Sequence, residues 1–414
     1  MTKTLIVNIG LLASPRGHQA LAGEAQGQIE KIENAHVLLQ NGRISQVETG
    51  RVPKSLLECA RVIDAKGGLV TPGLVDAHTH LVFGGWRAHE MQMKLAGVPY
   101  LDILAQGGGI LSTVRQTRAA SPQDLAEKAQ AALDEMLRLG TTTCEAKSGY
   151  GLNLQDEIKQ LEVTAALNRK GPMQLVSTLM AAHAVPEEYR DNRRSFMDLL
   201  MNEIIPATAQ GQLAEYCDIF CERGVFSAEE SREILLAARR HGLGLKIHAD
   251  EIEAIGASQL AGELGAVSAE HLIAITPEGI SALVKGGTIA CLLPATSFYL
   301  DKAYAPARAL IAAGVPVAVA TDFNPGSCPG LNLQLCINLA SLKYKMTPEE
   351  ILSAVTLNAA AAIGLAEEIG SLEPGKQADL VIWDAPDLDF LCYRFGSNLA
   401  RTVLKKGEIV AQNK

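Results

Sequence analysis

The chain has 414 residues, of which 48% are hydrophobic, 20% are charged and only 4% are aromatic, and its formal net charge is −9. This composition is typical of a globular protein with a large aliphatic core. The absence of a basic block argues against a nucleic-acid partner. No apolar run is long enough to span a bilayer, so we expect no membrane partner either.

The cysteines and the first residues predict the cellular setting. The eight cysteines are scattered and form no CxxC pair. Cys217 and Cys221 lie an even number of positions apart on an expected strand, so their side chains point to the same face of that strand. We therefore predict two core thiols and no disulfide between them. The opening segment MTKTLIVNIG lacks the layout of a signal peptide. We therefore expect a reducing, cytoplasmic location.

In chain order, residues 1–70 consist of short strand-like runs and turns, beginning with LIVNIG and HVLLQNGRISQVE. The tail from Gly370 has the same character, with the runs ADLVIWD and RTVLKKGEIVAQ. Chain termini often lie close together in space. We therefore predict one small sheet domain formed by residues 1–70 plus 370–414.

The middle of the chain, residues 71–369, alternates between strands and helices. The expected strands are Leu74–His80, Thr141–Lys147, Gln174–His183, Tyr216–Glu222, Gly244–Asp250, Ala266–His271, Thr288–Pro294 and Pro316–Asp322. Such alternation is typical of a parallel sheet. Eight strand–helix units predict a closed α/β barrel of the (β/α)8 type, which one domain of this size can hold.

Local signals mark several of the helices between these strands. Ser121-Pro122 is a helix start with proline at the first position, and Ser227 with Glu230 has capping-box spacing. Thr347 with Glu350 has the same spacing. Gly140, Gly242 and Gly314 stand where helices should end.

Nearly every apolar run of the middle region ends in a residue that can bind a metal or move a proton. In chain order these residues are His78 and His80, Lys147 with Tyr150, His183, Glu222, His248 with Glu251, His271, Thr296 and Asp322. In a barrel all strand C-termini meet at one face, where active sites lie. Residues separated by 250 positions in sequence can therefore converge there.

The strongest local signal is the HxH pair of His78 and His80 in DAHTH. Two residues apart on a strand, both imidazoles project to the same side and can chelate one divalent metal. A core histidine at His248 and a turn-forming Asp322 are reasonable interpretations of each residue alone. With the HxH pair, three imidazoles and one carboxylate instead predict a mixed site, which suits zinc, iron, nickel or manganese.

Three further residues have alternative interpretations. His271 is either a fourth imidazole ligand or a base beside the metal, and we favour the base. Lys147 could be carboxylated and bridge two metals, but its position on the second strand favours a single metal, with Lys147 shaping the site or pairing with Glu145. Arg87, just after the HxH pair, is either a solvated arginine or a fork for a substrate carboxylate.

Several segments together resemble known enzymes over essentially the whole chain. The segments TPGLVDAHTH, KIHADE, EHL, VAVATDFNPGS and GSLEPGKQADLVIWD resemble the amidohydrolase superfamily. More narrowly, HLVFGGWRAHE, EAKSGYGL, AAHAVPEEY, LLPATSFYL and TDFNPGSCPGLNLQL resemble the imidazolonepropionase family within it. The first set is shared by many hydrolases and deaminases, whereas the second set is more specific. Met91 departs from the pattern, since an aromatic residue is expected after RxHE.

The resemblance implies a barrel with a small β-sandwich domain, usually in a homodimer, and one zinc or iron ion per chain. The implied metal ligands are His78, His80, His248 and Asp322. The implied substrate-contact positions are Arg87, Tyr150, His183, Glu251, Asn324, Gly326 and Ser327.

The implied reaction is hydrolysis of the ring amide of an imidazolone that bears a carboxylate side chain, with a metal-activated water as nucleophile. The expected catalytic residues are His271, Glu251 and Asp322, and which of them is the main base stays open. The alternative is a deaminase of a purine, pyrimidine or related ring. A non-enzymatic scaffold of the same fold is disfavoured, because all four metal ligands are present.

Overall fold

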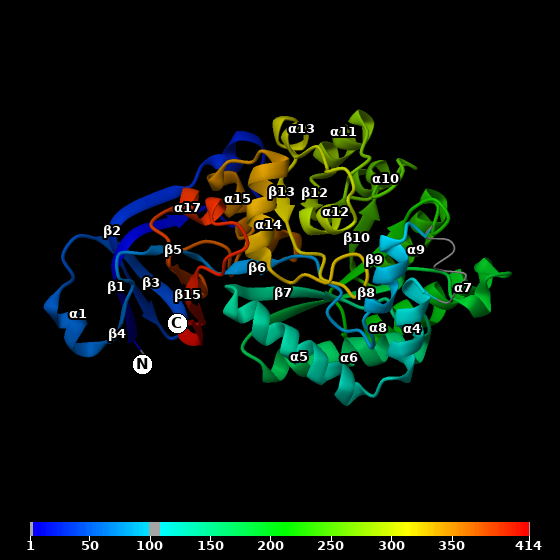
Figure 1. Ribbon diagram of the computed structural model, residues 1–414, viewed down its shortest axis with the longest axis horizontal. Helices are drawn as coiled ribbons and strands as arrows, with labels where there is room; N and C mark the ends of the chain where they lie inside the picture. Colours follow the sequence, from blue (N-terminus) through cyan, green and yellow to red (C-terminus); the bar gives the residue numbers. More distant parts are fainter. Residues whose placement is uncertain (1–2, 99–107, 414) are drawn as a thin grey trace.

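Two sheets organise the computed structural model, which describes residues 3–98 and 108–413 (Figure 1). The first sheet contains eight parallel strands that neighbour one another in chain order. These strands are β6 (Leu74–Asp76), β7 (Thr141–Lys147), β8 (Gln174–Ala182), β9 (Tyr216–Cys221), β10 (Gly244–Ala249), β11 (Ser268–His271), β12 (Ile289–Leu292) and β13 (Val317–Val319).

The ends of this sheet meet just beyond β6 and β13. The amide of Asp322 donates to the carbonyl of His78 at 3.0 Å, and the amide of His80 donates to the carbonyl of Phe323 at 2.8 Å. A parallel bridge between Thr79 and Phe323 joins the same two segments. The predicted parallel barrel is therefore confirmed, and each of its eight strands lies where a strand was expected.

The helices surround the barrel or join its strands. They are α1 (Lys54–Cys59), α2 (Met91–Leu95), α4 (Ile110–Ala119), α5 (Pro122–Arg138), α6 (Leu154–Lys170), α7 (Arg193–Leu199), α8 (Ile205–Gln210), α9 (Ala228–Arg240), α10 (Ala257–Glu263), α11 (Pro277–Gly286), α12 (Pro294–Tyr299), α13 (Ala307–Ala312), α14 (Leu333–Leu339), α15 (Pro348–Ala354), α16 (Leu357–Ala362) and α17 (Leu388–Tyr393).

The predicted helix boundaries are also confirmed. Ser121, Ser227 and Thr347 each cap a helix through the expected capping box, before α5, α9 and α15. The three predicted stop glycines, Gly140, Gly242 and Gly314, follow α5, α9 and α13 and have φ of 98°, 85° and 88°. These backbone angles lie in the region that favours glycine, so the stop signal has a direct steric cause.

Strands from the two chain ends form the second sheet, as predicted. They are β1 (Lys3–Ser14), β2 (Glu30–Gln40), β3 (Arg43–Thr49), β4 (Arg61–Asp64), β5 (Leu69–Pro72), β14 (Leu380–Trp383), β15 (Ala400–Lys405) and β16 (Glu408–Gln412). The strand order is β16-β15-β14-β5-β1-β2-β3, and β4 also pairs with β1. Figure 1 shows this sheet beside one end of the barrel. The domain boundaries at residues 70/71 and 369/370 stay a prediction.

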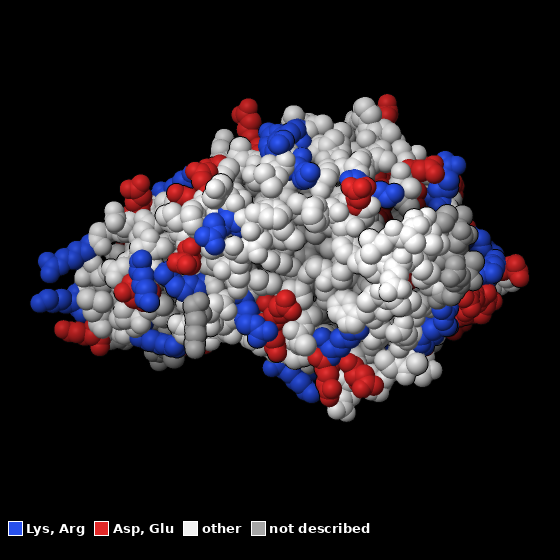
Figure 2. All heavy atoms as spheres, in the orientation of Figure 1, with Lys and Arg blue, Asp and Glu red and all other residues white. Residues whose placement is uncertain are grey.

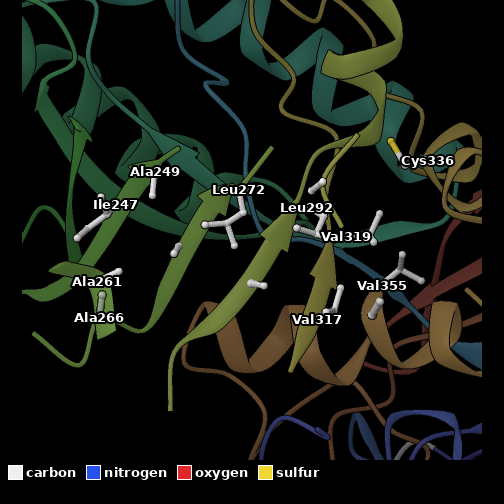
Figure 3. Close-up of a cluster of buried hydrophobic side chains, with 14 of the residues drawn as sticks. Ile247, Ala249, Ala261, Ala266, Leu272, Leu292, Val317, Val319, Cys336 and Val355 are labelled. Carbon is white, nitrogen blue, oxygen red and sulfur yellow. The ribbon is translucent and has the colours of Figure 1, made fainter. Parts of the chain in front are cut away.

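The alternation of side chains along the barrel strands divides the apolar core from the polar interior. On β10, Ile247 and Ala249 belong to the largest apolar cluster, whereas Lys246 and His248 form ion pairs inside the barrel. Figure 3 shows part of this cluster, in which strand residues lie near side chains such as Cys336 from the helices. The barrel interior is thus free to carry polar chemistry, because the outer faces of its strands supply the core.

Two further expectations concern the cysteines and the surface. Cys217 and Cys221 are free thiols in the core, as predicted. Within the described residues, none of the helices has the length and apolar character that crossing a membrane requires. On the face drawn in Figure 2, basic and acidic side chains are interspersed.

Candidate functional site

Four histidines from three strand ends converge at the C-terminal mouth of the barrel. The ring centroid of His78 lies 5.3 Å from that of His80, 4.6 Å from that of His248 and 5.8 Å from that of His271. Asp322 joins them, with Oδ1 3.4 Å from Nε2 of His78 and 3.5 Å from Nε2 of His80. All five side chains are at most 3% exposed. The structure therefore brings together every residue that the sequence placed at the metal centre.

The donor atoms of this cluster fit a metal ion. Two ligand groups, His78–His80–Asp322 and His78–His248–His271, each have their ligating atoms within 4.8 Å of one another. Nε2 of His78 and Nε2 of His248 are buried and have no hydrogen-bond partner among the described residues. Buried imidazole nitrogens without partners are unfavourable unless something binds them. The set of imidazoles plus one carboxylate is chemically suited to a transition metal.

Two carboxylates that the sequence analysis missed contact the opposite nitrogens of these imidazoles. Glu270 Oε2 lies 2.8 Å from Nδ1 of His78, and Asp218 Oδ2 lies 3.0 Å from Nδ1 of His248. A carboxylate at Nδ1 holds the proton there and leaves Nε2 as the ligating atom, an arrangement common around metals in proteins. The available signal was the presence of Asp218 and Glu270 within otherwise apolar strand runs, where charged residues are rare.

The site environment keeps most of these imidazoles neutral. Burial, reinforced by nearby positive groups, holds the pKa of His78 and that of His80 well below the usual range. Burial also lowers the pKa of His271 to about 3. For Asp218, burial acts upward, but the charges of His248 and Lys147 hold its pKa well below the usual range. His248 is the exception, because burial acts to lower its pKa but the charge of Asp218 raises it above the usual value. An ionised Asp218 and neutral His78, His80 and His271 are the protonation states that suit metal binding.

The acid–base candidates lie beside the cluster. Glu251 follows β10, and its Oε2 is 3.6 Å from Nε2 of His271. Burial raises the pKa of Glu251 to about 7 and also raises that of Asp322. Thr296 donates to Oδ2 of Asp322 at 2.6 Å, which fixes the carboxylate orientation. A carboxyl group with a pKa near neutrality can both accept and release a proton.

Backbone strain is concentrated at the same strand ends. Asp250, His271 and Asp322 have φ of 50°, 67° and 57°, in the left-handed region that residues with a side chain rarely adopt. Strand expectations that extended to Asp250 and Asp322 were therefore too long, since β10 ends at Ala249 and β13 at Val319. Strained residues of this kind cluster at functional sites.

Arg87 is held at the rim by the neighbouring loop after β13. Its amide donates to the carbonyl of Pro325 at 3.2 Å. A Cβ atom built on Gly326 would lie 1.1 Å from Nη2 of Arg87, so the guanidinium rests directly against this glycine. Among residues 3–98 and 108–413, Nε of Arg87 is buried and has no hydrogen-bond partner. An unpaired buried guanidinium nitrogen is a binding position for an anion.

The other predicted substrate-contact residues divide into two groups. Asn324 uses its amide within its own loop: Oδ1 accepts from the amides of Gly326 and Ser327, both at 2.8 Å, and Nδ2 donates to Ser327 Oγ at 2.8 Å. Ser327 Oγ, having accepted that bond, can donate its own proton. Asn324 therefore shapes the loop that carries Gly326 and Ser327.

Tyr150 and His183 contact the cluster through the ring of His80. The ring of His183 stacks on that of His80, with centroids 5.0 Å apart, and the ring of Tyr150 lies 5.4 Å from that of His183. Nδ1 of His183 is 3.1 Å from the carbonyl of Gly149, which only accepts, so Nδ1 carries the proton and Nε2 is an acceptor. Burial raises the pKa of Tyr150, so its hydroxyl stays protonated and can donate.

Lys147 does not lie free at the mouth of the barrel. Its Nζ is 2.7 Å from Oδ2 of Asp218 and 2.9 Å from Oε2 of Glu145. The predicted pairing with Glu145 is confirmed. The Lys147 ammonium group already binds two carboxylates. This double ion pair argues against the alternative in which a carboxylated Lys147 bridges two metals.

Comparison with known proteins agrees with this geometry. The model of the amidohydrolase family matches residues 69–410. Imidazolonepropionase of Fusobacterium nucleatum is 51% identical over 408 residues, covering 98% of each chain. Imidazolonepropionase of Alkaliphilus metalliredigens is 48% identical over 414 residues, covering 99% of this chain and 98% of the relative.

Solved structures share the fold at lower identity. A zinc-bound adenosine deaminase from Xanthomonas campestris is 21% identical, with a TM-score of 0.71 over 99% of this chain and 92% of that one. A 5-methylcytosine deaminase from Klebsiella pneumoniae, liganded with phosphonocytosine, is 18% identical, with a TM-score of 0.74 over 99% of this chain and 98% of that one. At this identity the likeness concerns the fold alone.

Proposed function

This chain belongs to the imidazolonepropionase group of the amidohydrolase family, and from that premise we propose that it hydrolyses the ring amide C–N bond of 4-imidazolone-5-propanoate. The product is N-formimidoyl-L-glutamate, and the reaction belongs to histidine degradation. The observation that carries the proposal is the buried Nε of Arg87, which has no partner within the described part of the chain, while the Arg87 charge acts on His183 and Tyr150 beside the histidine cluster. A substrate with a carboxylate tail on a small ring matches this pairing of an anion site with a metal centre.

The residues that would hold the metal are His78, His80, His248 and Asp322, with one ion of zinc or iron per chain. The convergent, unpartnered imidazole nitrogens support this assignment. Such an ion supplies Lewis acidity, which lowers the pKa of water and polarises a carbonyl oxygen.

The protein side chains supply the proton transfers. Asp322 and His271 are assigned to take the proton from the attacking water. Glu251, with its pKa near 7 and its carboxylate 3.6 Å from His271, is assigned to deliver a proton to the ring nitrogen as the C–N bond breaks. Protonation of that nitrogen makes it a good leaving group.

The remaining rim residues orient the substrate. Arg87 holds the propionate, with the Tyr150 and Ser327 hydroxyls as further donors. His183 offers Nε2 as an acceptor, so it binds a ring N–H and not the ring carbonyl. Gly326 and Asn324 act through the loop, because Gly326 makes room for the guanidinium and Asn324 fixes the turn.

Addition of 4-imidazolone-5-propanoate to the purified protein should abolish the imidazolone absorbance and yield formiminoglutamate without free ammonia.

Arg87→Ala should lower kcat/KM for 4-imidazolone-5-propanoate about 10- to 150-fold, because a hydrogen bond to a charged group contributes about 1.5–3 kcal/mol. The same variant should leave turnover of an analogue without the carboxylate nearly unchanged. Arg194→Ala, which removes an exposed arginine on α7, serves as the control.

Two outcomes would contradict the proposal. Ammonia release from a purine or pyrimidine, with no action on the imidazolone, would favour the deaminase function. An equal loss on both compounds in Arg87→Ala would show that Arg87 does not recognise the acid tail.

Gly326→Ala should raise KM for the imidazolone about 10-fold with little change in kcat. A methyl group at this position has no space unless the Arg87 guanidinium moves, so the variant should weaken one charge-assisted contact. Gly330→Ala is the matched control, because a Cβ at Gly330 meets nothing within 4 Å. Steady-state kinetics of both variants measure the effect, and an unchanged KM in Gly326→Ala would refute this role.

We also propose a homodimer and a cytoplasmic location. Family membership is the ground for the dimer. The six buried free cysteines support a reducing compartment, where thiols stay unpaired.

A further inference from the structure

A chain of buried charges lies beneath the histidine cluster and reaches two of its imidazoles. Its first arm runs from His248 to Asp218 and on to Lys147: Nδ1 of His248 is 3.0 Å from Oδ2 of Asp218, and Lys147 Nζ is 2.7 Å from the same oxygen. The other carboxylate oxygen, Oδ1, accepts from the amide of Ile219 at 2.7 Å. Asp218 is therefore held on both sides and cannot turn away from the imidazole.

The second arm runs from His78 to Glu270 and on to Lys246. Nδ1 of His78 is 2.8 Å from Oε2 of Glu270, whose other oxygen lies 3.9 Å from Lys246 Nζ. The Ser268 hydroxyl donates to that same oxygen, Oε1. Like Asp218, Glu270 has its second oxygen fixed, so its first oxygen faces the imidazole.

Glu145 joins the two arms. Its Oε2 is 2.9 Å from Lys147 Nζ, and its Oε1 is 2.9 Å from Lys246 Nζ. The hydroxyl of Thr178 donates to Oε1 at 2.5 Å. Both lysines and all three carboxylates are at most 1% exposed. Three carboxylates therefore share two ammonium groups directly below the site that would receive a cation.

From this arrangement we propose that Lys147 and Lys246 are positioning residues for the metal. Each lysine holds a carboxylate against Nδ1 of one imidazole, so that Nε2 of His248 and Nε2 of His78 point together into the mouth of the barrel. Glu145 couples the lysines and thereby links two ligands that come from different strands. A buried carboxylate deprived of its cation would reorient or attract other partners, and the imidazole it holds would lose its alignment.

The test measures zinc affinity of the folded protein by competition with a chromogenic chelator, so it does not depend on turnover. Lys147→Met should weaken zinc affinity about 10- to 100-fold, the usual effect of removing a residue that orients a ligand. Lys405→Met is the matched control: Lys405 is also buried and paired with an aspartate, Asp379 at 2.7 Å, but lies on β15 in the other sheet. It should lower thermal stability without changing zinc affinity.

A double variant keeps the test valid if Lys147→Met does not fold. Asp218→Asn with Lys147→Met removes both charges of the pair, and Glu145 keeps Lys246 as an ammonium partner at 2.9 Å. If Lys147 acts through Asp218, the double variant should bind zinc no more weakly than Asp218→Asn alone. Zinc affinity within twofold of wild type in Lys147→Met, or an equal loss in Lys405→Met, would overturn the proposal. The inference rests on the proposed metal site and not on the substrate, so a failed ring-opening assay does not affect it.

Discussion

His248→Ala should lose both the bound ion and essentially all turnover. Purified wild-type protein should contain about one ion per chain by elemental analysis, because the four assigned ligands form one site. Without the ion, the pKa of the attacking water returns from about 7 towards about 15.7, so we expect a fall in kcat of at least roughly 1,000-fold. Removal of the metal by a chelator should reproduce this loss in the wild type.

The control for this variant is His36→Ala, which truncates a buried histidine of β2 in the other sheet. It should retain its ion and its turnover. A stoichiometry of two ions per chain, or full activity without metal, would contradict the mononuclear site.

Glu251→Gln and His271→Ala should keep their metal but react about 100-fold more slowly or worse, as is typical when a positioned acid or base is removed. Elemental analysis and kcat measured on the same samples separate this effect from loss of the ion. Glu253→Gln, which alters an exposed neighbour paired with Arg223, should have wild-type kinetics. Wild-type speed in either of the first two variants would exclude that residue from proton transfer.

The pH profile provides a second measurement on Glu251. Burial raises the pKa of this carboxyl to about 7, and a group that delivers a proton must be protonated before it can act. The wild-type kcat/KM should therefore fall as the pH rises above about 7, and this basic limb should be absent in Glu251→Gln. An unchanged limb in the variant would assign it to another group.

The sequence predicted the barrel and the identity of the cluster because both depend on local patterns. Each apolar run ends in a polar residue, and in a parallel barrel those ends must meet. The expected strand limits were less accurate: Leu74–His80 ends at Asp76 in the structure, since His78 and His80 leave the strand to face the cluster. Left-handed backbone at His271 and Asp322 has no signal in a hydrophobicity pattern.

The supporting contacts could not be predicted, because they join residues from distant parts of the chain. The pairing of Glu270 with His78 crosses 192 positions, and that of Lys147 with Asp218 crosses 71. The contact of Gly326 with the Arg87 guanidinium likewise depends on how two loops pack. A single sequence shows the charges within the strands but not which neighbour each one meets.

The strand order of the second sheet has a consequence for biosynthesis. β5 pairs with β1 on one side and with β14 on the other, and β15 and β16 extend the sheet beyond β14. A ribosome adding about 5–20 residues per second needs roughly 15–60 s to pass from β5 to β14. Throughout that interval, the edge of β5 that β14 later covers has no partner in this sheet. The nascent chain should therefore depend on chaperones until the final strands emerge, and a chain interrupted before β14 should aggregate even if its barrel has formed.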